Sequence, residues 1–379
     1  MKIGIMTYWK STCNYGEQLQ NYALQKYLRD LGHEPFLICY DYDNDTIRTP
    51  FCLRILKAFN PGQLARYSYN RKLIRDGISH PRGFERFRER YLSLSRSYPT
   101  IEDLVSDPPE ADMYISGSDQ VWNTFGGGLT HMKNRIRAFF LDFGNDDTIR
   151  ASYAASWGRN SIPDDEYGFI KPLLSRFDAV SVRESSGLDI CRQLGADDAR
   201  LATDPVLLHD ADVYRQLYSE SDAGYSSSKY LFFYYMNNDI DYDRTRVIDW
   251  ARSKGLEVVY VTDDWHDNIT RSFPGVAEWL KLIDNAEYVV TNSYHCVLFS
   301  IIFRKRFGVI KRFGEYAGMN TRMDSVFETF EIGSRYIDDS GFDIIEQPLD
   351  VTVKDHLRSM CTPKDIVDTS VLKTRNREA

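Results

Sequence analysis

Hydrophobic and polar positions along the chain alternate as expected for short buried strands that are each followed by an amphipathic helix. Apolar residues at Ile3, Ile5 and Met6 predict a strand, and apolar positions from Leu19 to Leu31 then recur at helical spacing. The same alternation predicts further strands over 35–40, 112–117, 149–158 and 178–184, and a helix over 185–195. Strands that alternate with helices predict a parallel, doubly wound sheet with helices on both faces.

The pattern begins again after residues 204–205. Strands are predicted over 229–236, 256–263, 287–292 and 306–311, and helices over 241–255, 275–286 and 295–304. A chain of 379 residues also exceeds what one hydrophobic core usually organises. We therefore expect an α/β protein with two Rossmann-like, doubly wound domains, 1–205 and 206–355, followed by a helix or tail over 356–379.

Composition excludes several classes of function. The net charge of −8 argues against a nucleic-acid partner, which requires a basic face. The six cysteines show no CxxC spacing and no short Cys/His pairing, so we expect no metal site and no disulfide framework. The N-terminal segment lacks the apolar core of a signal peptide, and no run of about 18 apolar residues occurs. These features predict a cytoplasmic protein with reduced thiols.

One segment of the first domain is strongly basic. Between positions 46 and 98 the chain carries twelve Lys and Arg residues and three acidic ones. Such an insertion, interleaved with aromatic residues, could rest on anionic lipid or hold a phosphorylated substrate. It could equally be a solvated pair of helices, and the sequence leaves both interpretations open.

Polar residues gather where predicted strands end, which is where doubly wound sheets bind ligands. At one such joint, Asn292 and Ser293 are good capping residues for a helix that begins near His295. A helix dipole disfavours a charged histidine in the first turn unless an anion lies beside it. His295 is therefore either a structural residue or part of an anion site. Other strand-end candidates are Asn14, Gly16, Gln18, Gly117, Ser118, Asp119, Arg183 and Glu184.

Several of these stretches together resemble the polysaccharide pyruvyltransferase family. They are "TYWKSTCNYGEQLQNYALQKYL", "SGSDQVWN", "YAASWG", "SVRESSGLDICRQLG", "DPVLL" and "AEYVVTNSYHCVLFSIIF", which run from the first strand toward Arg335. The resemblance implies two Rossmann-like domains that face each other across a cleft, as in GT-B glycosyltransferases. It also implies phosphoenolpyruvate as donor and a pair of sugar hydroxyls as acceptor, giving a pyruvate ketal on a bacterial surface glycan.

The resemblance further suggests roles for individual residues. His295 matches the family's catalytic or donor-binding histidine, and Arg183 matches an arginine expected to hold the donor. Related chains commonly carry an arginine where Ser293 stands here and a glycine where Cys296 stands. We expect Arg322 to replace the missing arginine, because related chains have a basic residue in that stretch.

The resulting hypothesis assigns each candidate a role. The catalytic residues are His295 as proton donor or phosphate anchor, Arg183, and Asp119 as base. Asn292, Ser293 and Arg322 are expected to bind the donor, and Asn14, Gly16, Gln18, Gly117 and Ser118 the acceptor. No metal or cofactor is required, since arginines supply the positive charge. The partners are phosphoenolpyruvate and a sugar or lipid-linked oligosaccharide, with peripheral contact to the inner membrane through the basic insertion.

Two alternatives remain open at this point. The same fold serves glycosyltransferases that use nucleotide-sugar donors, for which Glu315 or Asp324 would be ribose-binding candidates. A catalytically inactive, glycan-binding relative is the other, because Ser293 and Cys296 depart from the family pattern.

Overall fold

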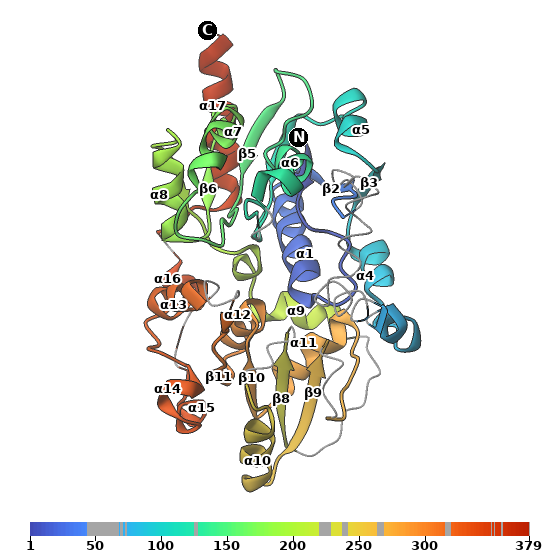
Figure 1. Cartoon of the computed structure of the whole chain (residues 1–379), viewed down its shortest axis with the longest axis vertical. Helices are drawn as coiled ribbons and strands as arrows, with labels where there is room; N and C mark the ends of the chain where they lie inside the picture. The colour runs from blue at the N-terminus through green and yellow to red at the C-terminus, as the bar shows by residue number, and fades with distance from the viewer. Residues whose placement is uncertain are drawn as a thin grey trace.

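The structure is a computed structural model of the chain. It describes residues 1–43, 68, 71–72, 74–124, 128–219, 229–236, 242–263, 269–314, 320–349, 351, 353–357 and 359–378. Figure 1 shows an elongated molecule in which one parallel sheet and its helices lie above a second. This arrangement confirms the α/β architecture with two Rossmann-like units that the strand and helix pattern predicts.

The first unit is built on a five-stranded parallel sheet. Its strands are β1 (Lys2–Met6), β2 (Glu34–Tyr40), β3 (Leu94–Tyr98), β4 (Met113–Ser116) and β5 (Ile149–Ser152), in the order β3-β2-β1-β4-β5. Isolated bridges, such as that between Ala155 and Val182, continue the sheet toward β6 (Ser181–Val182) and β7 (Arg200–Leu201). The helices of this unit are α1 (Tyr15–Asp30), α4 (Phe84–Tyr91), α5 (Ile101–Ser106), α6 (Gly128–Phe139), α7 (Asp164–Leu174) and α8 (Ser185–Gln193).

The second unit has a four-stranded parallel sheet in the order β11-β10-β8-β9. Its strands are β8 (Tyr230–Tyr235), β9 (Glu257–Thr262), β10 (Tyr288–Thr291) and β11 (Arg306–Val309). The connecting elements are η1 (Pro205–Leu208), α9 (Ala211–Tyr218), α10 (Thr245–Ser253), α11 (Val276–Asn285), α12 (Tyr294–Ile302), α13 (Asn320–Thr329), α14 (Ile337–Ser340), α15 (Asp343–Glu346) and α16 (Val353–His356). β8 and α12 are almost wholly buried, which explains why both read as continuous apolar runs in the sequence.

The last helix returns to the first unit. The backbone N–H of Cys361 donates to the carbonyl of Leu201 at 3.0 Å, and α17 (Pro363–Glu378) then packs against β5 and α1. Figure 1 shows α17 beside β5, far from the second sheet. Within the segment predicted as a helix or tail over 356–379, residues 363–378 form α17, which packs against the first unit.

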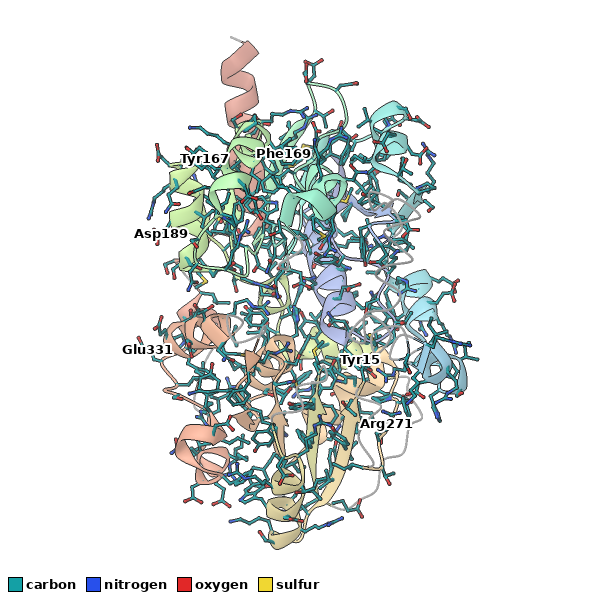
Figure 2. The ribbon with its side chains drawn as sticks, viewed as in Figure 1. Tyr15, Tyr167, Phe169, Asp189, Arg271 and Glu331 are labelled. Carbon is teal, nitrogen blue, oxygen red and sulfur yellow. The ribbon has the colours of Figure 1, made fainter. Side chains whose placement is uncertain are left out.

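The two units share apolar packing through α1. Tyr15, in the first turn of α1, stacks on Trp279 of α11 with ring centroids 5.2 Å apart, and its hydroxyl donates to the carbonyl of Pro274 at 2.8 Å. Figure 2 places Tyr15 at the junction of α1 with the second unit. Because these contacts are buried, they fix how the strand ends of the two sheets are oriented toward each other.

The basic segment predicted as an insertion is partly a component of the sheet. Its end forms α4 and the edge strand β3, while residues 44–67 lie outside the described part of the chain. Two described ion pairs tie the segment to the second unit: Arg82 with Asp263, and Asp76 with Arg271, each at 2.6 Å. Among the described residues, no helix is long and apolar enough to cross a membrane.

Candidate functional site

The strand-to-helix joint after β10 is built from short polar side chains. The Thr291 hydroxyl accepts from the backbone N–H of Ser293 at 3.0 Å, and Ser293 caps α12 by accepting from the N–H of Cys296 at 3.5 Å. The Asn292 carboxamide accepts from the N–H of Met236 at 2.8 Å and donates to its carbonyl at 2.9 Å. Asn292 and Ser293 therefore shape the joint, and their predicted role in donor binding remains a prediction.

His295 lies in the first turn of α12, between the two units. Its Nε2 is 3.5 Å from Oδ2 of Asp204, a distance that allows charge attraction but is too long for a strong hydrogen bond. On its other side the ring packs on Gly16 of α1, where an added Cβ would lie 2.2 Å from Nδ1. Gly16, predicted to line the acceptor side, thus gives the imidazole room to reach the start of α1.

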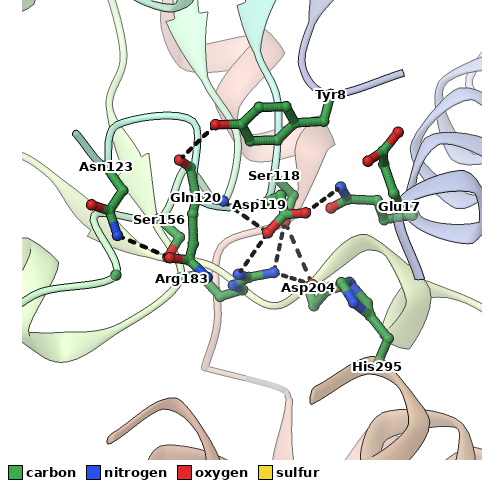
Figure 3. Close-up of polar contacts among 12 residues, drawn as sticks. Tyr8, Glu17, Ser118, Asp119, Gln120, Asn123, Ser156, Arg183, Asp204 and His295 are labelled. Atoms are coloured by element: carbon green, nitrogen blue, oxygen red, sulfur yellow. Dashed lines mark hydrogen bonds and ion pairs between the residues drawn. The ribbon is translucent and has the colours of Figure 1, made fainter. Parts of the chain in front are cut away.

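Asp204 connects His295 with Arg183. Its carboxylate, fully buried, accepts from Nη1 of Arg183 at 2.6 Å and from the Ser118 hydroxyl at 3.5 Å (Figure 3). Oδ1 also accepts from the N–H of Val206 at 3.1 Å, so Asp204 caps the short helix η1. Burial alone would raise the pKa of Asp204, but His295, Arg183 and this backbone N–H outweigh burial and hold the pKa well below its usual range.

Arg183 extends from the end of β6 into this network. Its Nη2 is 3.8 Å from Oδ1 of Asp119, and its guanidinium carbon is 4.6 Å from the centre of the Tyr294 ring. Burial lowers the pKa of Arg183, but Tyr294, Asp204 and Asp119 together raise it above its usual range. Asp119 itself has a φ of 81°, a strained value for a non-glycine residue, and its carboxylate accepts from the Gln120 N–H at 2.8 Å.

Arg322 approaches the same tyrosine ring from α13, in the second unit. Its guanidinium carbon is 5.3 Å from the centre of the Tyr294 ring. Burial and the neighbouring Arg183 lower the pKa of Arg322 to about 10. With its amide oxygen turned toward Arg322, Gln120 accepts from Nη2 at 2.8 Å and from Nη1 at 3.2 Å. The two arginines therefore repel each other across a buried site, which an anion between them would relieve.

A small cavity lies where these side chains meet. Its free volume is about 30 Å³, and it is bordered by both arginines, α13 and the segment near Met360. Several buried polar atoms of the lining have no hydrogen-bond partner among the described residues: Nε and Nη2 of Arg183, Nε of Arg322, Oε2 of Glu184 and Oγ1 of Thr203. Buried polar groups are almost always paired, so these atoms indicate a site for a ligand or water. His295 reaches this cavity through Asp204.

The other acceptor candidates have structural contacts of their own. Asn14 caps α1 by accepting from the N–H of Glu17 at 3.3 Å, and Gln18 donates to the carbonyl of Trp9 at 2.9 Å. A Cβ on Gly117 would meet the Thr7 side chain at 3.0 Å, so this glycine allows a close approach to β1. Of the five predicted acceptor residues, Ser118 and Gly16 therefore lie closest to the arginine and histidine groups.

Sequence reasoning assigned no role to Asp204 and Tyr294, and placed Glu184 only at a strand end. Asp204 precedes a proline, and this Asp-Pro pair indicates only a domain boundary. Tyr294 directly precedes His295 and is predicted only as part of the joint before the helix. Glu184, which lines the cavity, accepts at Oε1 from the Ser156 hydroxyl at 2.9 Å and from the N–H of Trp157 at 2.7 Å, while its Oε2 has no hydrogen-bond partner among the described residues. No cluster of three or more His, Cys, Asp or Glu side chains among the described residues could hold a metal ion.

Solved structures resemble the chain in fold. A UDP-GlcNAc 2-epimerase from Methanocaldococcus jannaschii is 11% identical with a TM-score of 0.51, covering 98% of this chain and 99% of that one. The structure of that organism's UDP-GlcNAc 2-epimerase with UDP-GlcNAc and UDP is also 11% identical, with a TM-score of 0.50 and coverage of 99% and 100%. These likenesses, together with the two facing parallel sheets, identify a fold of the GT-B type.

The family is identified at the level of sequence. No curated protein matches the chain. The sequence profile of the family described as polysaccharide pyruvyl transferase matches residues 14–312. This range includes Arg183, Asp204 and His295, and the ends of strands β6 and β10. The chain therefore belongs to the polysaccharide pyruvyl transferase family and is a transferase.

Proposed function

We propose that this enzyme transfers a pyruvyl group from phosphoenolpyruvate to two hydroxyls of a sugar in a bacterial surface-glycan precursor, forming a pyruvate ketal. The observation that carries the proposal is the cavity where Arg183 and Arg322, one from each unit, present buried N–H groups without partners. A small donor that bears both a carboxylate and a phosphate suits two separate guanidinium groups.

The electrostatics of the cavity favour such a donor. Arg183 already pairs with Asp204, whereas Arg322 has no described carboxylate within ion-pair distance. An anionic donor would neutralise the repulsion between the arginines and satisfy the N–H groups that the protein leaves unpaired. Tyr294, between the two guanidinium groups, would then form one wall of the donor site.

The chemistry requires an acid, a base and charge neutralisation. His295 is not among the residues that line the closed cavity, so we expect the methylene carbon of phosphoenolpyruvate to reach the imidazole only in the widened, donor-bound site. There His295 protonates that carbon, and the central carbon becomes electrophilic. One sugar hydroxyl adds to this carbon, and the second displaces phosphate to close the ketal. The two hydroxyl protons balance the one gained by the new methyl group and the one carried away by the phosphate. Asp119 would serve as base for a hydroxyl, and the arginines stabilise the charge on the departing phosphate.

Donor binding also requires the cavity to widen. A free volume of about 30 Å³ suits one or two water molecules and is too small for a phosphorylated three-carbon acid. Because α13 and the segment near Met360 form one wall of the cavity, we propose that this wall moves outward when the donor enters. The acceptor would approach from the side of α1, where Asn14, Gly16 and Gln18 lie.

The acceptor class is part of the proposal. A lipid-linked oligosaccharide would place the enzyme at the inner face of the membrane, with the basic segment over 46–98 directed toward anionic lipid. Two exposed isoleucines of this segment support that orientation, since Ile74 and Ile78 are 63% and 77% exposed.

The function is tested by mass spectrometry of lipid-linked glycans incubated with the enzyme and phosphoenolpyruvate. The expected product carries one additional pyruvate as a ketal and appears together with free phosphate. His295→Ala should lower turnover about a hundredfold or more. Transfer of a sugar from a UDP- or GDP-sugar, without ketal formation, would replace the proposal with glycosyl transfer. Glycan binding without phosphate release would indicate an inactive relative.

A further inference from the structure

A side chain of the first unit reaches across to hold Arg322, which belongs to the second unit. Arginine has N–H donors and no acceptor, so the carboxamide of Gln120 turns its oxygen toward the guanidinium. That oxygen accepts from Nη2 of Arg322 at 2.8 Å and from Nη1 at 3.2 Å. Gln120 is buried and is not among the residues that line the cavity, whereas Arg322 is. Gln120 therefore acts on the cavity through Arg322.

The turn that follows β4 fixes the place of Gln120. Its backbone N–H donates to Oδ1 of Asp119 at 2.8 Å, and its backbone carbonyl accepts from the Tyr8 hydroxyl at 3.3 Å (Figure 3). Gly158 leaves room for the side chain, since a Cβ there would lie 2.5 Å from the carboxamide of Gln120 and 2.6 Å from Nδ2 of Asn123. The carboxamide is therefore confined between the guanidinium on one side and Asn123 on the other.

Hydrogen bonding alone would favour a glutamate at position 120. One terminal atom of the carboxamide meets the donors of Arg322, and the other lies 2.9 Å from Nδ2 of Asn123. The two oxygens of a carboxylate could accept from both neighbours, whereas a carboxamide offers one oxygen and one NH2 group. A carboxylate would also form a charge-assisted hydrogen bond with the guanidinium and neutralise it. The neutral side chain at this position leaves the positive charge of Arg322 uncompensated.

The two arginines of the cavity differ in this respect. Arg183 pairs with the carboxylate of Asp204 at 2.6 Å, so its charge is compensated within the protein. Arg322 has no described carboxylate within ion-pair distance, and burial together with Arg183 lowers the pKa of Arg322 to about 10. Its Nε also has no hydrogen-bond partner within the described part of the chain. The uncompensated positive charge of the cavity is therefore centred on Arg322.

The start of α13, which carries Arg322, is fixed by further hydrogen bonds. The side chain of Asn320, the first residue of α13, accepts from the N–H of Arg312 at 3.0 Å and donates to its carbonyl at 2.9 Å. Arg322 follows two positions later, whereas the rest of the wall that α13 contributes lies over 325–329. The contact with Gln120 can therefore persist while the far end of α13 moves to admit a ligand.

We propose that Gln120 is a positioning residue that holds Arg322 in the donor cavity and leaves its positive charge available to the anionic groups of the donor. The proposal rests on the proposed function, because it takes the donor to be phosphoenolpyruvate. The neutral oxygen of Gln120 holds Nη1 and Nη2, and Nε remains for the donor. Because the guanidinium is ordered before the donor arrives, binding loses less conformational entropy.

The test is a calorimetric titration of phosphoenolpyruvate into two variants of the full-length enzyme. Gln120→Glu keeps an acceptor for Arg322 and adds a negative charge, so it should retain the melting temperature of the wild type and weaken donor binding more than about tenfold. Gln120→Met removes the acceptor without adding charge. It should lower the melting temperature, because buried N–H groups lose their partner, and weaken binding only about two- to tenfold, the cost of ordering one long side chain.

The less stable variant is thus expected to bind the donor more tightly, an order that a purely structural role would not produce. Gln193→Glu is the matched control, because it changes the net charge equally at an exposed residue that does not line the cavity. It should bind phosphoenolpyruvate as the wild type does. Wild-type affinity in Gln120→Glu, or affinity losses that follow the losses of stability, would overturn the proposal. If Gln120→Glu fails to fold, unchanged affinity in Gln120→Met would overturn it.

Titration of inorganic phosphate separates this proposal from the proposed function. The expected order of affinity for phosphate, in a protein that neither binds phosphoenolpyruvate nor forms a ketal, would contradict the proposed function alone. Ketal formation by Gln120→Glu with the kcat and the KM for phosphoenolpyruvate of the wild type would contradict the role of Gln120 alone. A wild type that binds neither anion would contradict both.

Discussion

Replacing Gly16 with alanine tests the packing of His295, the proposed proton donor, against α1. A Cβ at this position would lie 2.2 Å from Nδ1 and 2.3 Å from Cγ of His295. Non-bonded atoms require about 3.5 Å, so the imidazole would have to move by more than about 1 Å. A displacement of this size in a reacting group costs about a hundredfold in rate. We therefore expect Gly16→Ala to lower kcat for ketal formation about a hundredfold.

Helix propensity alone predicts that Gly16→Ala stabilises the protein, whereas a clash with His295 predicts that it destabilises the protein. Measuring stability therefore distinguishes the two effects. Alanine in place of glycine inside a helix stabilises by about 0.5–1 kcal/mol, whereas overpacking costs about 1–3 kcal/mol. The matched control is Gly168→Ala, because Gly168 is exposed in α7 and a Cβ there would have no neighbour within 4 Å. Chemical denaturation should show a gain for Gly168→Ala and a loss or no gain for Gly16→Ala. Equal gains, with wild-type turnover in both variants, would refute the reasoning.

Two further predictions concern buried charge. Burial raises the pKa of Glu17 from 4.5 to about 8. Between these two pH values the folded protein keeps a proton on Glu17 that the unfolded chain has released. The free energy of unfolding therefore falls as pH rises through this range. Melting curves should therefore show Glu17→Gln gaining stability over the wild type from pH 5 to about pH 8, and a pH-independent difference would contradict this account. Arg82→Met should lower the free energy of unfolding, measured in urea, by about 3–5 kcal/mol. The substitution leaves the carboxylate of Asp263, whose side chain is 9% exposed, without this ion pair. The double variant with Asp263→Leu should recover most of that loss, and a double variant as unstable as the single one would contradict the charge argument.

Most of the fold can be predicted from the sequence, because its strands are short apolar runs that end at polar or turn-forming residues. The runs over 229–236 and 287–292 correspond to β8 and β10, and α8 spans most of 185–195. The strand predicted over 149–158 is shorter, because Ala154 adopts a φ of 52° and the chain leaves the ladder after Ser152. The predicted strand over 178–184 narrows to Ser181–Val182 for a related reason, since its neighbouring residues form isolated bridges instead of a continuous ladder.

The candidate site was less accessible to sequence reasoning. Sequence reasoning placed Arg183 and His295 at the ends of separate strands, where doubly wound sheets bind ligands, and in the structure both side chains lie beside Asp204. The contact between Asp204 and His295 spans 91 positions and depends on how the two units dock, which no local pattern encodes. Gly16 was expected to line the acceptor side, but only the docking of α12 against α1 shows that its missing side chain makes room for the imidazole.

Calorimetric titration of phosphoenolpyruvate tests the central claim that a cavity between two arginines holds the donor. The wild type should bind phosphoenolpyruvate, and Arg183→Gln and Arg322→Gln should each weaken binding about tenfold or more, since each loses a charge-assisted hydrogen bond of about 1.5–3 kcal/mol. His295→Gln should bind the donor with an affinity closer to that of the wild type, because the proposed function assigns His295 to the chemical step and donor binding to the arginines. Equal affinity in the wild type and both arginine variants, or no binding by any of them, would contradict the account.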